Sequence, residues 1–236
     1  GIDKKFTLKS DFNVLLSVII GLVMLSLWGL LWSFWGALNS IPLMVAAISG
    51  LVVIFISTEA KKAIVLQFRE KQKLPLTLFT GGILAITICY ASNGPSVYDT
   101  GAYHLPVVKW LNEYGTVYGI ANLDPHYGFA SIWFYLAGLL DFGVFKGVPF
   151  HFLNAILMTI AISWCFASLK RMYKGAYRHQ DLFSILLLVY IFFNKHIISS
   201  ISPDLPVVVI GFIILFLFLE YETVADHTFY LFSAAV

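Results

Sequence analysis

The sequence predicts an all-α fold: a polytopic bundle of transmembrane helices, with two interfacial helices in a long outer loop. Of its 236 residues, 59% are hydrophobic and only 12% are charged, which is about half the charged fraction of a typical soluble domain. The apolar residues come in blocks of roughly the 20 residues that a helix needs to cross the hydrocarbon core. Strands are not expected, because a lone segment in lipid satisfies its own backbone groups only as a helix.

Six apolar blocks qualify as spans, and we place them at 14–36, 40–57, 75–92, 147–168, 182–199 and 204–220. Residues 1–74 then hold two N-terminal spans and a basic loop. Residues 75–236 hold the core portion, with an outer loop at 93–146. The chain begins with Gly1 and closes on "FYLFSAAV", which is typical of the start of another helix. We therefore expect an excised N-terminal portion of a larger protein.

The basic residues predict the orientation of these spans. Twelve of the fifteen Lys and Arg residues fall in three clusters, at 4–9, 61–73 and 170–178, and counting spans puts all three on one side. The positive-inside rule makes that side cytoplasmic. The sequence thus predicts an integral protein of the bacterial cytoplasmic membrane, with its chemistry on the non-cytoplasmic side. The lipid bilayer is the expected partner, and nucleic acid is not, since no basic stripe interleaved with aromatic residues appears.

Two helices are expected inside the outer loop. After Pro106, which suits a first helical turn, Val107, Trp110, Leu111 and Tyr114 recur at helical spacing, so this segment predicts an amphipathic interfacial helix. The apolar piece 128–142 is short for a span, and crossing fully would move the cluster at 170–178 to the outer side. We expect it to lie along the outer interface or to dip into it.

The first candidate site is "YDTGAYH" at 98–104. A carboxylate at the membrane boundary is costly to desolvate, so Asp99 is expected to face a cavity or a partner. Tyr98 and Tyr103 can stack on, and hydrogen-bond to, a flat polar ligand such as a sugar. His104 could share a proton or bind a metal. The alternative is that Asp99, helped by Thr100, only caps the helix that follows.

The second candidate site is "ANLDPHYGF" at 121–129, where Asp124 and His126 flank Pro125. A simple turn is the alternative, because Asp-Pro commonly forms one. Asp99 and Asp124 with either histidine could also hold a divalent cation. No other metal-binding spacing, nucleophile elbow or phosphate-binding glycine loop is present, so no cofactor is firmly implied.

The third candidate site is "SSISPDLP" at 199–206. Asp204 could cap the last helix, or it could lie opposite Asp99 across one cavity, because the predicted topology puts both at the same depth. Lys195 and His196 precede this turn and could bind a phosphate by charge or by hydrogen bonding.

With "YDTGAYH" as its acidic motif, the stretch 75–220 resembles the GT-C glycosyltransferases, polytopic enzymes that use polyprenyl-phosphate sugar donors. In that family a span leads into a long outer loop with an acidic residue near its start and a tyrosine after it, which here are Asp99 and Tyr103. Uncharacterised bacterial membrane proteins with a Tyr-Asp-Thr-Gly-x-Tyr-His stretch are also similar. The chain departs from the GT-C pattern in two additional early spans and in lacking a paired-acid motif at Asp99.

The GT-C resemblance implies a hexosyl or pentosyl transfer with a polyprenyl-phosphate-linked sugar as the partner. Asp99 would act as general base on the acceptor hydroxyl or orient it. Lys195, a cation, or a basic residue beyond the chain's end would balance the phosphate. The main alternative is a polytopic transporter or flippase, which predicts mid-span charges, broken helices and repeats that the sequence does not clearly show. A polysaccharide polymerase or ligase and a non-catalytic scaffold remain further alternatives.

Overall fold

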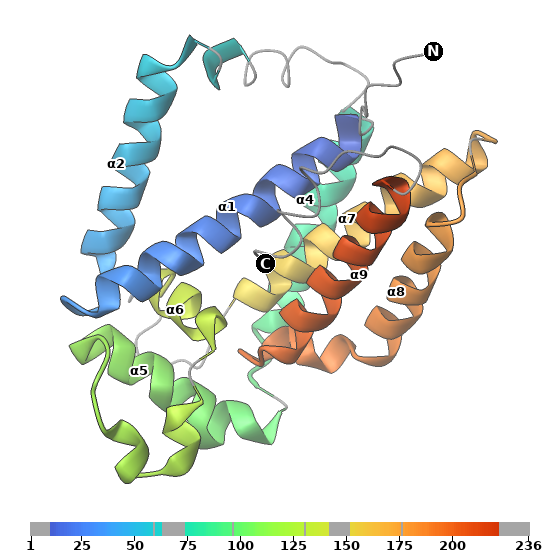
Figure 1. Ribbon diagram of the computed structural model, residues 1–236. Helices are drawn as coiled ribbons and strands as arrows, with labels where there is room; N and C mark the ends of the chain where they lie inside the picture. Colours follow the sequence, from blue (N-terminus) through green and yellow to red (C-terminus); the bar gives the residue numbers. More distant parts are fainter. Residues whose placement is uncertain are drawn as a thin grey trace.

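Six main helices form the body of the molecule, which is shown as a computed structural model in Figure 1. The structure describes residues 10–58, 60–62, 74–95, 97–129, 131–141, 152–175 and 177–221, and within them the regular structure is helical, with no strand. The main helices are α1 (Ser10–Ser33), α2 (Ser40–Ile56), α4 (Leu74–Ala91), α7 (Leu153–Tyr173), α8 (Asp181–Phe193) and α9 (Asp204–Tyr221). The all-α prediction is therefore confirmed for this part of the chain.

The helix bounds agree with the second, third and sixth expected apolar blocks to within one residue. The first block was expected at 14–36, and α1 runs from Ser10 to Ser33. The fourth block was expected at 147–168, but α7 runs from Leu153 to Tyr173, and residues 147–151 lie outside the described part. The fifth was expected at 182–199, but α8 ends at Phe193 and a separate 3₁₀ turn follows at Lys195–Ser199. The Asn194 side chain donates to the Tyr190 carbonyl (3.0 Å), a bond that competes with continuation of the helix.

Two described helical stretches are long and apolar enough to cross a membrane, Leu15–Ser33 and Leu153–Tyr173. Four shorter helical stretches are also apolar, namely Ser40–Ile56, Thr77–Ala91, Asp181–Phe193 and Asp204–Leu219. By length and composition, the structure thus contains two candidate membrane helices.

Successive main helices run in opposite directions, so the connections gather at two ends of the bundle (Figure 1). At the loop end, in the lower half of that view, lie residues 34–39, 92–95, 97–129, 131–141 and 194–203. At the basic end lie residues 57–58, 60–62, 174–175 and 177–180, together with the last turn of α7, where Lys170 and Arg171 are found. The basic residues at 4–9 and 69–73, Lys146 and the closing "FYLFSAAV" lie outside the described residues.

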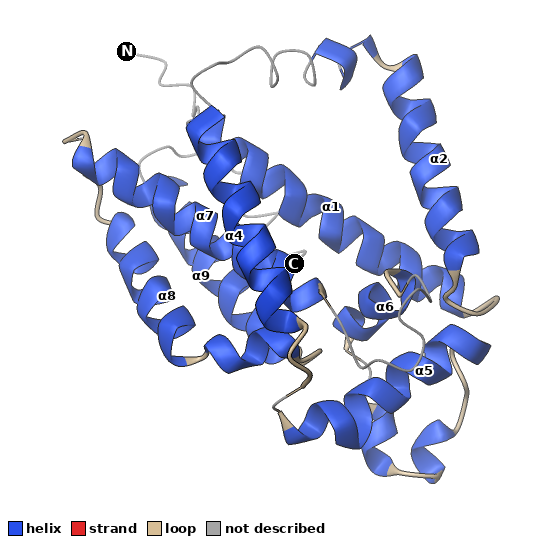
Figure 2. Ribbon diagram, turned by 180° about the vertical axis from the view of Figure 1, so that it is seen from behind, coloured by secondary structure: helices blue, strands red, loops and turns tan. Residues whose placement is uncertain are grey.

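The core is built around α7, which is buried along most of its length between α4, α8 and α9 (Figure 2). Hydroxyl pairs join it to α4, where Thr87 lies 2.8 Å from Thr159 and Thr80 lies 2.9 Å from Ser163. In contrast, α2 buries only Pro42 of its 17 residues.

The loop end contains two short helices, and they differ in burial. Helix α5 (Leu105–Tyr114) is amphipathic as expected, with Val107, Val108 and Leu111 buried and Glu113 exposed. Its C-terminus docks on α1 through Gly115 (φ +73°), where an added Cβ would lie 2.5 Å from the Ser33 carbonyl oxygen.

Helix α6 (Ile132–Leu139) corrects the expectation of a second interfacial helix. Seven of its eight residues, Trp133 to Leu139, are buried. It packs so closely on α1 that a Cβ added to Gly29 would come within 3.0 Å of the Tyr135 carbonyl oxygen. The physical reason is composition: a helix that is apolar on every side is stable when protein surrounds it.

Candidate functional site

The acidic motif lies on a π-helical turn, Thr100–His104, that continues directly into α5. Such turns place one extra residue in the helix and are frequent at functional sites. Asp99 has helical backbone angles (φ −57°, ψ −29°) and makes no side-chain capping bond. The capping alternative for Asp99 is therefore wrong. Its carboxylate is exposed and lies near enough to the Tyr103 side chain to raise the pKa of that tyrosine.

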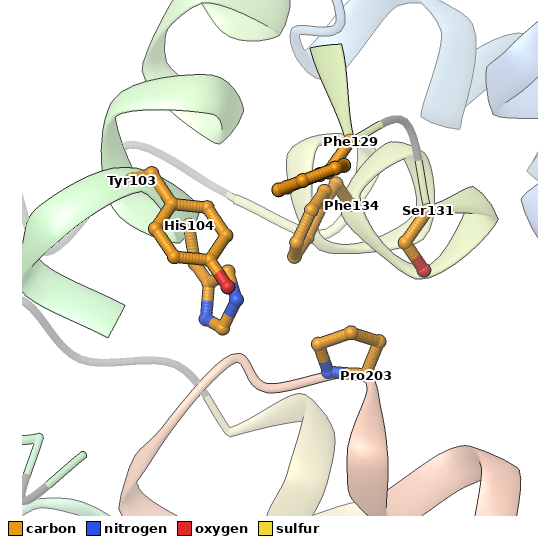
Figure 3. A pocket seen from close by; sticks show the side chains of 6 residues that line it. All are labelled: Tyr103, His104, Phe129, Ser131, Phe134 and Pro203. Carbon is orange, nitrogen blue, oxygen red and sulfur yellow. The ribbon is translucent and has the colours of Figure 1, made fainter. Parts of the chain in front are cut away.

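A cavity of about 310 Å³ lies beside this turn. Figure 3 shows six side chains converging on it from three separate segments of the chain, and they are Tyr103, His104, Phe129, Ser131, Phe134 and Pro203. The rings pack against one another: the Tyr103 and His104 centroids are 4.3 Å apart, and those of His104 and Phe134 are 5.1 Å apart. Since Phe129 is 61% exposed, the cavity is bordered by residues that reach the surface.

His104 is the most enclosed polar residue of the cavity. This residue is only 3% exposed, and its Nδ1 atom has no hydrogen-bond partner. Burial lowers the pKa of His104, and the negative charges of Asp99 and Asp204 partly oppose that shift. The lowered pKa favours the neutral imidazole near pH 7, and its Nδ1 is both enclosed and unpartnered.

Asp99 and Asp204 both affect the pKa of Tyr103, although 105 residues separate them in the chain. Burial, the charge and hydrogen bond of Asp99 and the charge of Asp204 all raise the pKa of Tyr103. Asp204 lies in the first turn of α9 and accepts a hydrogen bond from Ser202 Oγ at 2.7 Å. Its own N–H donates to Ser202 Oγ (3.3 Å), so Ser202 supplies the capping oxygen rather than Asp204.

Asp124 and His126 form a pair at the rim. Asp124 accepts from the His126 N–H (2.9 Å) and pairs with His126 Nδ1 (2.7 Å), which places it at the start of the 3₁₀ turn Pro125–Gly128. The segment thus forms the turn that the Asp-Pro sequence suggested. The two bonds to His126 hold the pKa of Asp124 below its usual value. The His126 ring also lies 5.3 Å from the Tyr103 ring, so this turn reaches the first cluster.

Of the predicted site residues, only Tyr103 and His104 line the cavity. Asp99, Asp124, His126 and Asp204 lie near it without lining it, and three further predicted binding residues do not line it either. Tyr98 is 86% exposed. Lys195 and His196 are exposed on the turn Lys195–Ser199, where the Lys195 ammonium lies 5.9 Å from the centre of the Phe192 ring. They share the loop end with the cavity, and their roles stay predictions.

The suggested cation site is not formed. Among the described residues, no three His, Cys, Asp or Glu side chains are grouped so that they could hold a metal ion. Asp124 is instead paired with His126.

Sequence reasoning missed the apolar walls of the cavity and the residue that supports them. Phe129 precedes α6 and Phe134 lies in its first turn. Nothing in the local sequence pattern connects either residue to Asp99. Asn154 is fully buried in α7, where it accepts from Trp133 Nε1 (3.0 Å) and donates to the carbonyls of Ile197 (3.2 Å) and Ser202 (3.3 Å). The one sign of its role in the sequence was that it is a single asparagine within an apolar block.

Comparison with protein families finds a single description. The model that matches residues 1–236 is that of a domain of unknown function, DUF8201. Neither the curated proteins nor the solved structures provide a match. Because the match extends over every residue from 1 to 236, the chain belongs to the DUF8201 family.

Proposed function

We propose that this chain is part of a membrane glycosyltransferase, which moves a sugar from a polyprenyl phosphate to an acceptor at the non-cytoplasmic face of the bacterial cytoplasmic membrane. The observation that carries the proposal is the position of Asp99. Its exposed, uncapped carboxylate lies beside Tyr103, which lines a cavity walled by aromatic rings, and Asp99 and Asp204 both raise the pKa of this tyrosine.

Exposed apolar helices support a polytopic membrane arrangement. On α2, Ile48 is 59% exposed, Phe55 74% and Ile56 77%. A helix that is apolar on all sides and yet unburied is stable in lipid and is a liability in water. The loop end then lies opposite the basic end, and the positive-inside rule assigns it to the non-cytoplasmic side.

The chemistry requires one base. Asp99 takes the proton from an acceptor hydroxyl while the acceptor oxygen attacks the anomeric carbon of the donor. The bond from that carbon to the phosphate oxygen breaks, and the polyprenyl phosphate leaves with the electron pair, so the anomeric configuration inverts. Tyr103 stays protonated because its pKa is raised by burial and by the two carboxylates, and its hydroxyl can therefore donate to Asp99 and orient it.

The test is Asp99→Asn in the full-length protein, assayed in membranes with radiolabelled polyprenyl-phosphate sugars and a mixture of acceptors. Loss of a general base lowers turnover by about 10²–10⁴-fold. Glu113→Gln is the matched control, because Glu113 is also an exposed acid but, unlike Asp99, does not act on Tyr103 or His104. Turnover retained in Asp99→Asn would remove Asp99 from the mechanism.

A transporter or flippase is the second candidate, and one observation favours it. Arg171 and Asp181 form a buried ion pair between α7 and α8, and Ser168 also donates to Asp181. Buried charges within apolar helices often mark transport paths. However, this pair joins the last turn of α7 to the first turn of α8 and lies at the basic end, away from the cavity. Donor consumption in the assay above separates the two functions.

A further inference from the structure

The charges around the cavity restrict what it can hold. Neither lysine nor arginine is among the described residues that line it. The two charged groups that act on its Tyr103 and His104 side chains, Asp99 and Asp204, are both acidic. A phosphate or a carboxylate placed here would face two like charges without a compensating cation, which is unfavourable in partly desolvated surroundings.

The lining suits an uncharged ring that carries hydroxyl groups. Phe129, Phe134 and Tyr103 offer apolar ring faces, and the tyrosine and Ser131 hydroxyls can both donate and accept hydrogen bonds. A volume of about 310 Å³ is at the lower end of the range for small-molecule sites. One sugar ring is therefore a better match than an extended lipid-linked donor.

His104 supplies a second and independent indication of a ligand. A buried polar atom without a partner is unusual and requires an explanation. Nδ1 of His104 is such an atom, and its ring is one of the six side chains that form the cavity (Figure 3). Nδ1 is enclosed in this conformation, so a ligand hydroxyl reaches it only after a small rotation of the ring toward the cavity. It could then bond to Nδ1 in either tautomer, because a hydroxyl both donates and accepts.

We propose that the cavity is a binding site for an uncharged sugar ring that serves as the acceptor, with one hydroxyl hydrogen-bonded to His104 Nδ1, and that the donor's phosphate binds elsewhere. The assignment as acceptor rests on the proposed function, because it uses Asp99 as the base. Binding of the ring itself can be measured without any turnover.

The experiment measures binding of free probes to the full-length protein in lipid nanodiscs by saturation-transfer difference NMR. The probes are the methyl glycosides of glucose, galactose, mannose and N-acetylglucosamine, with methyl glucuronide and inorganic phosphate as anionic comparisons. We expect at least one neutral glycoside to bind, and the anions to be at least tenfold weaker. If no neutral glycoside binds, or if an anion binds as tightly, the proposal is overturned.

Two variants then test the contact to His104. Asparagine keeps a hydrogen-bonding atom near the position of Nδ1, whereas glutamine places one near Nε2. His104→Asn should hold the neutral glycoside within about threefold of the original protein, and His104→Gln should weaken it by about tenfold, the usual effect of one lost hydrogen bond. Equal affinities in the two variants, with thermal unfolding midpoints that match, would contradict the contact.

The two proposals fail in different ways. If Asp99→Asn retains turnover while neutral glycosides bind through His104, the mechanism is wrong and the sugar site stands. If Asp99→Asn abolishes turnover while the cavity binds no neutral glycoside, the transferase stands and the cavity is not its acceptor site.

Discussion

His104 combines two properties that normally exclude each other, because it is a titratable group that is almost fully enclosed and yet lacks a partner at Nδ1. Burial destabilises the charged imidazolium and so lowers the pKa, while the negative charges of Asp99 and Asp204 stabilise the imidazolium and raise the pKa. Burial is the larger effect, so the pKa of His104 is lowered. The neutral ring can then offer a donor and an acceptor to an uncharged ligand.

The lowered pKa of His104 predicts how stability changes with pH. Below the usual histidine pKa of about 6.5 the unfolded chain binds a proton at this residue, while the folded chain does not until its lower pKa is reached. The unfolded state then holds more protons, so stability falls as pH falls through this window. We expect the thermal unfolding midpoint in detergent to decrease more between pH 7.5 and 5 for the original protein than for His104→Asn.

The control for this pH dependence is His179→Gln, since His179 is exposed at the basic end. Its curve should follow that of the original protein. A His104→Asn curve that runs parallel to the original over the whole range would show that His104 titrates normally.

At the level of elements, two helices, one turn and the segment that precedes α9 meet at Asn154. Its amide connects the start of α7 to Trp133 of α6 and to the segment that precedes α9. The Pro203 ring and the Asp204 carboxylate follow that segment by one and two residues. The distance between the α6 wall and the α9 wall of the cavity therefore depends on one buried side chain, which makes Asn154 a positioning residue.

Replacement of Asn154 by leucine should be costly. Trp133 Nε1 and the Ser202 carbonyl would lose the partner described above, and each unsatisfied buried group costs about 1–3 kcal/mol. We expect a lower free energy of unfolding by about 2–4 kcal/mol, measured as a lower denaturation midpoint. Binding of the neutral glycoside should weaken as well, because the cavity walls would no longer be held together. Asn122→Leu, at an exposed position in the turn Ile120–Asn122, should change neither quantity, and an unaltered Asn154→Leu protein would rule out this role.

At the level of the whole molecule, alternation of apolar blocks was enough to predict where the main helices lie and which connections share an end. That is why Asp99 and Asp204, more than a hundred residues apart, could be predicted to lie at the same end of the bundle. The burial of α6 could not be predicted, because composition alone does not distinguish an apolar helix in lipid from one inside protein. The π-helical turn and the Asn154 network were also hidden, since both depend on contacts between distant segments.

The direction of the bundle across the membrane is the last expectation that can be tested. We propose a cysteine-free background of the full-length protein, which includes Cys89→Ala and Cys165→Ala and carries one new cysteine at a time. Glu113→Cys probes the loop end and Lys174→Cys the basic end, and both positions are exposed. A membrane-impermeant maleimide applied to intact spheroplasts should label the first at once and the second only after permeabilisation, because the basic end is held in the cytoplasm. Labelling of Lys174→Cys alone in intact spheroplasts would show that the bundle has the opposite orientation. The cavity would then face the cytoplasm, which contradicts the proposed transfer at the non-cytoplasmic face.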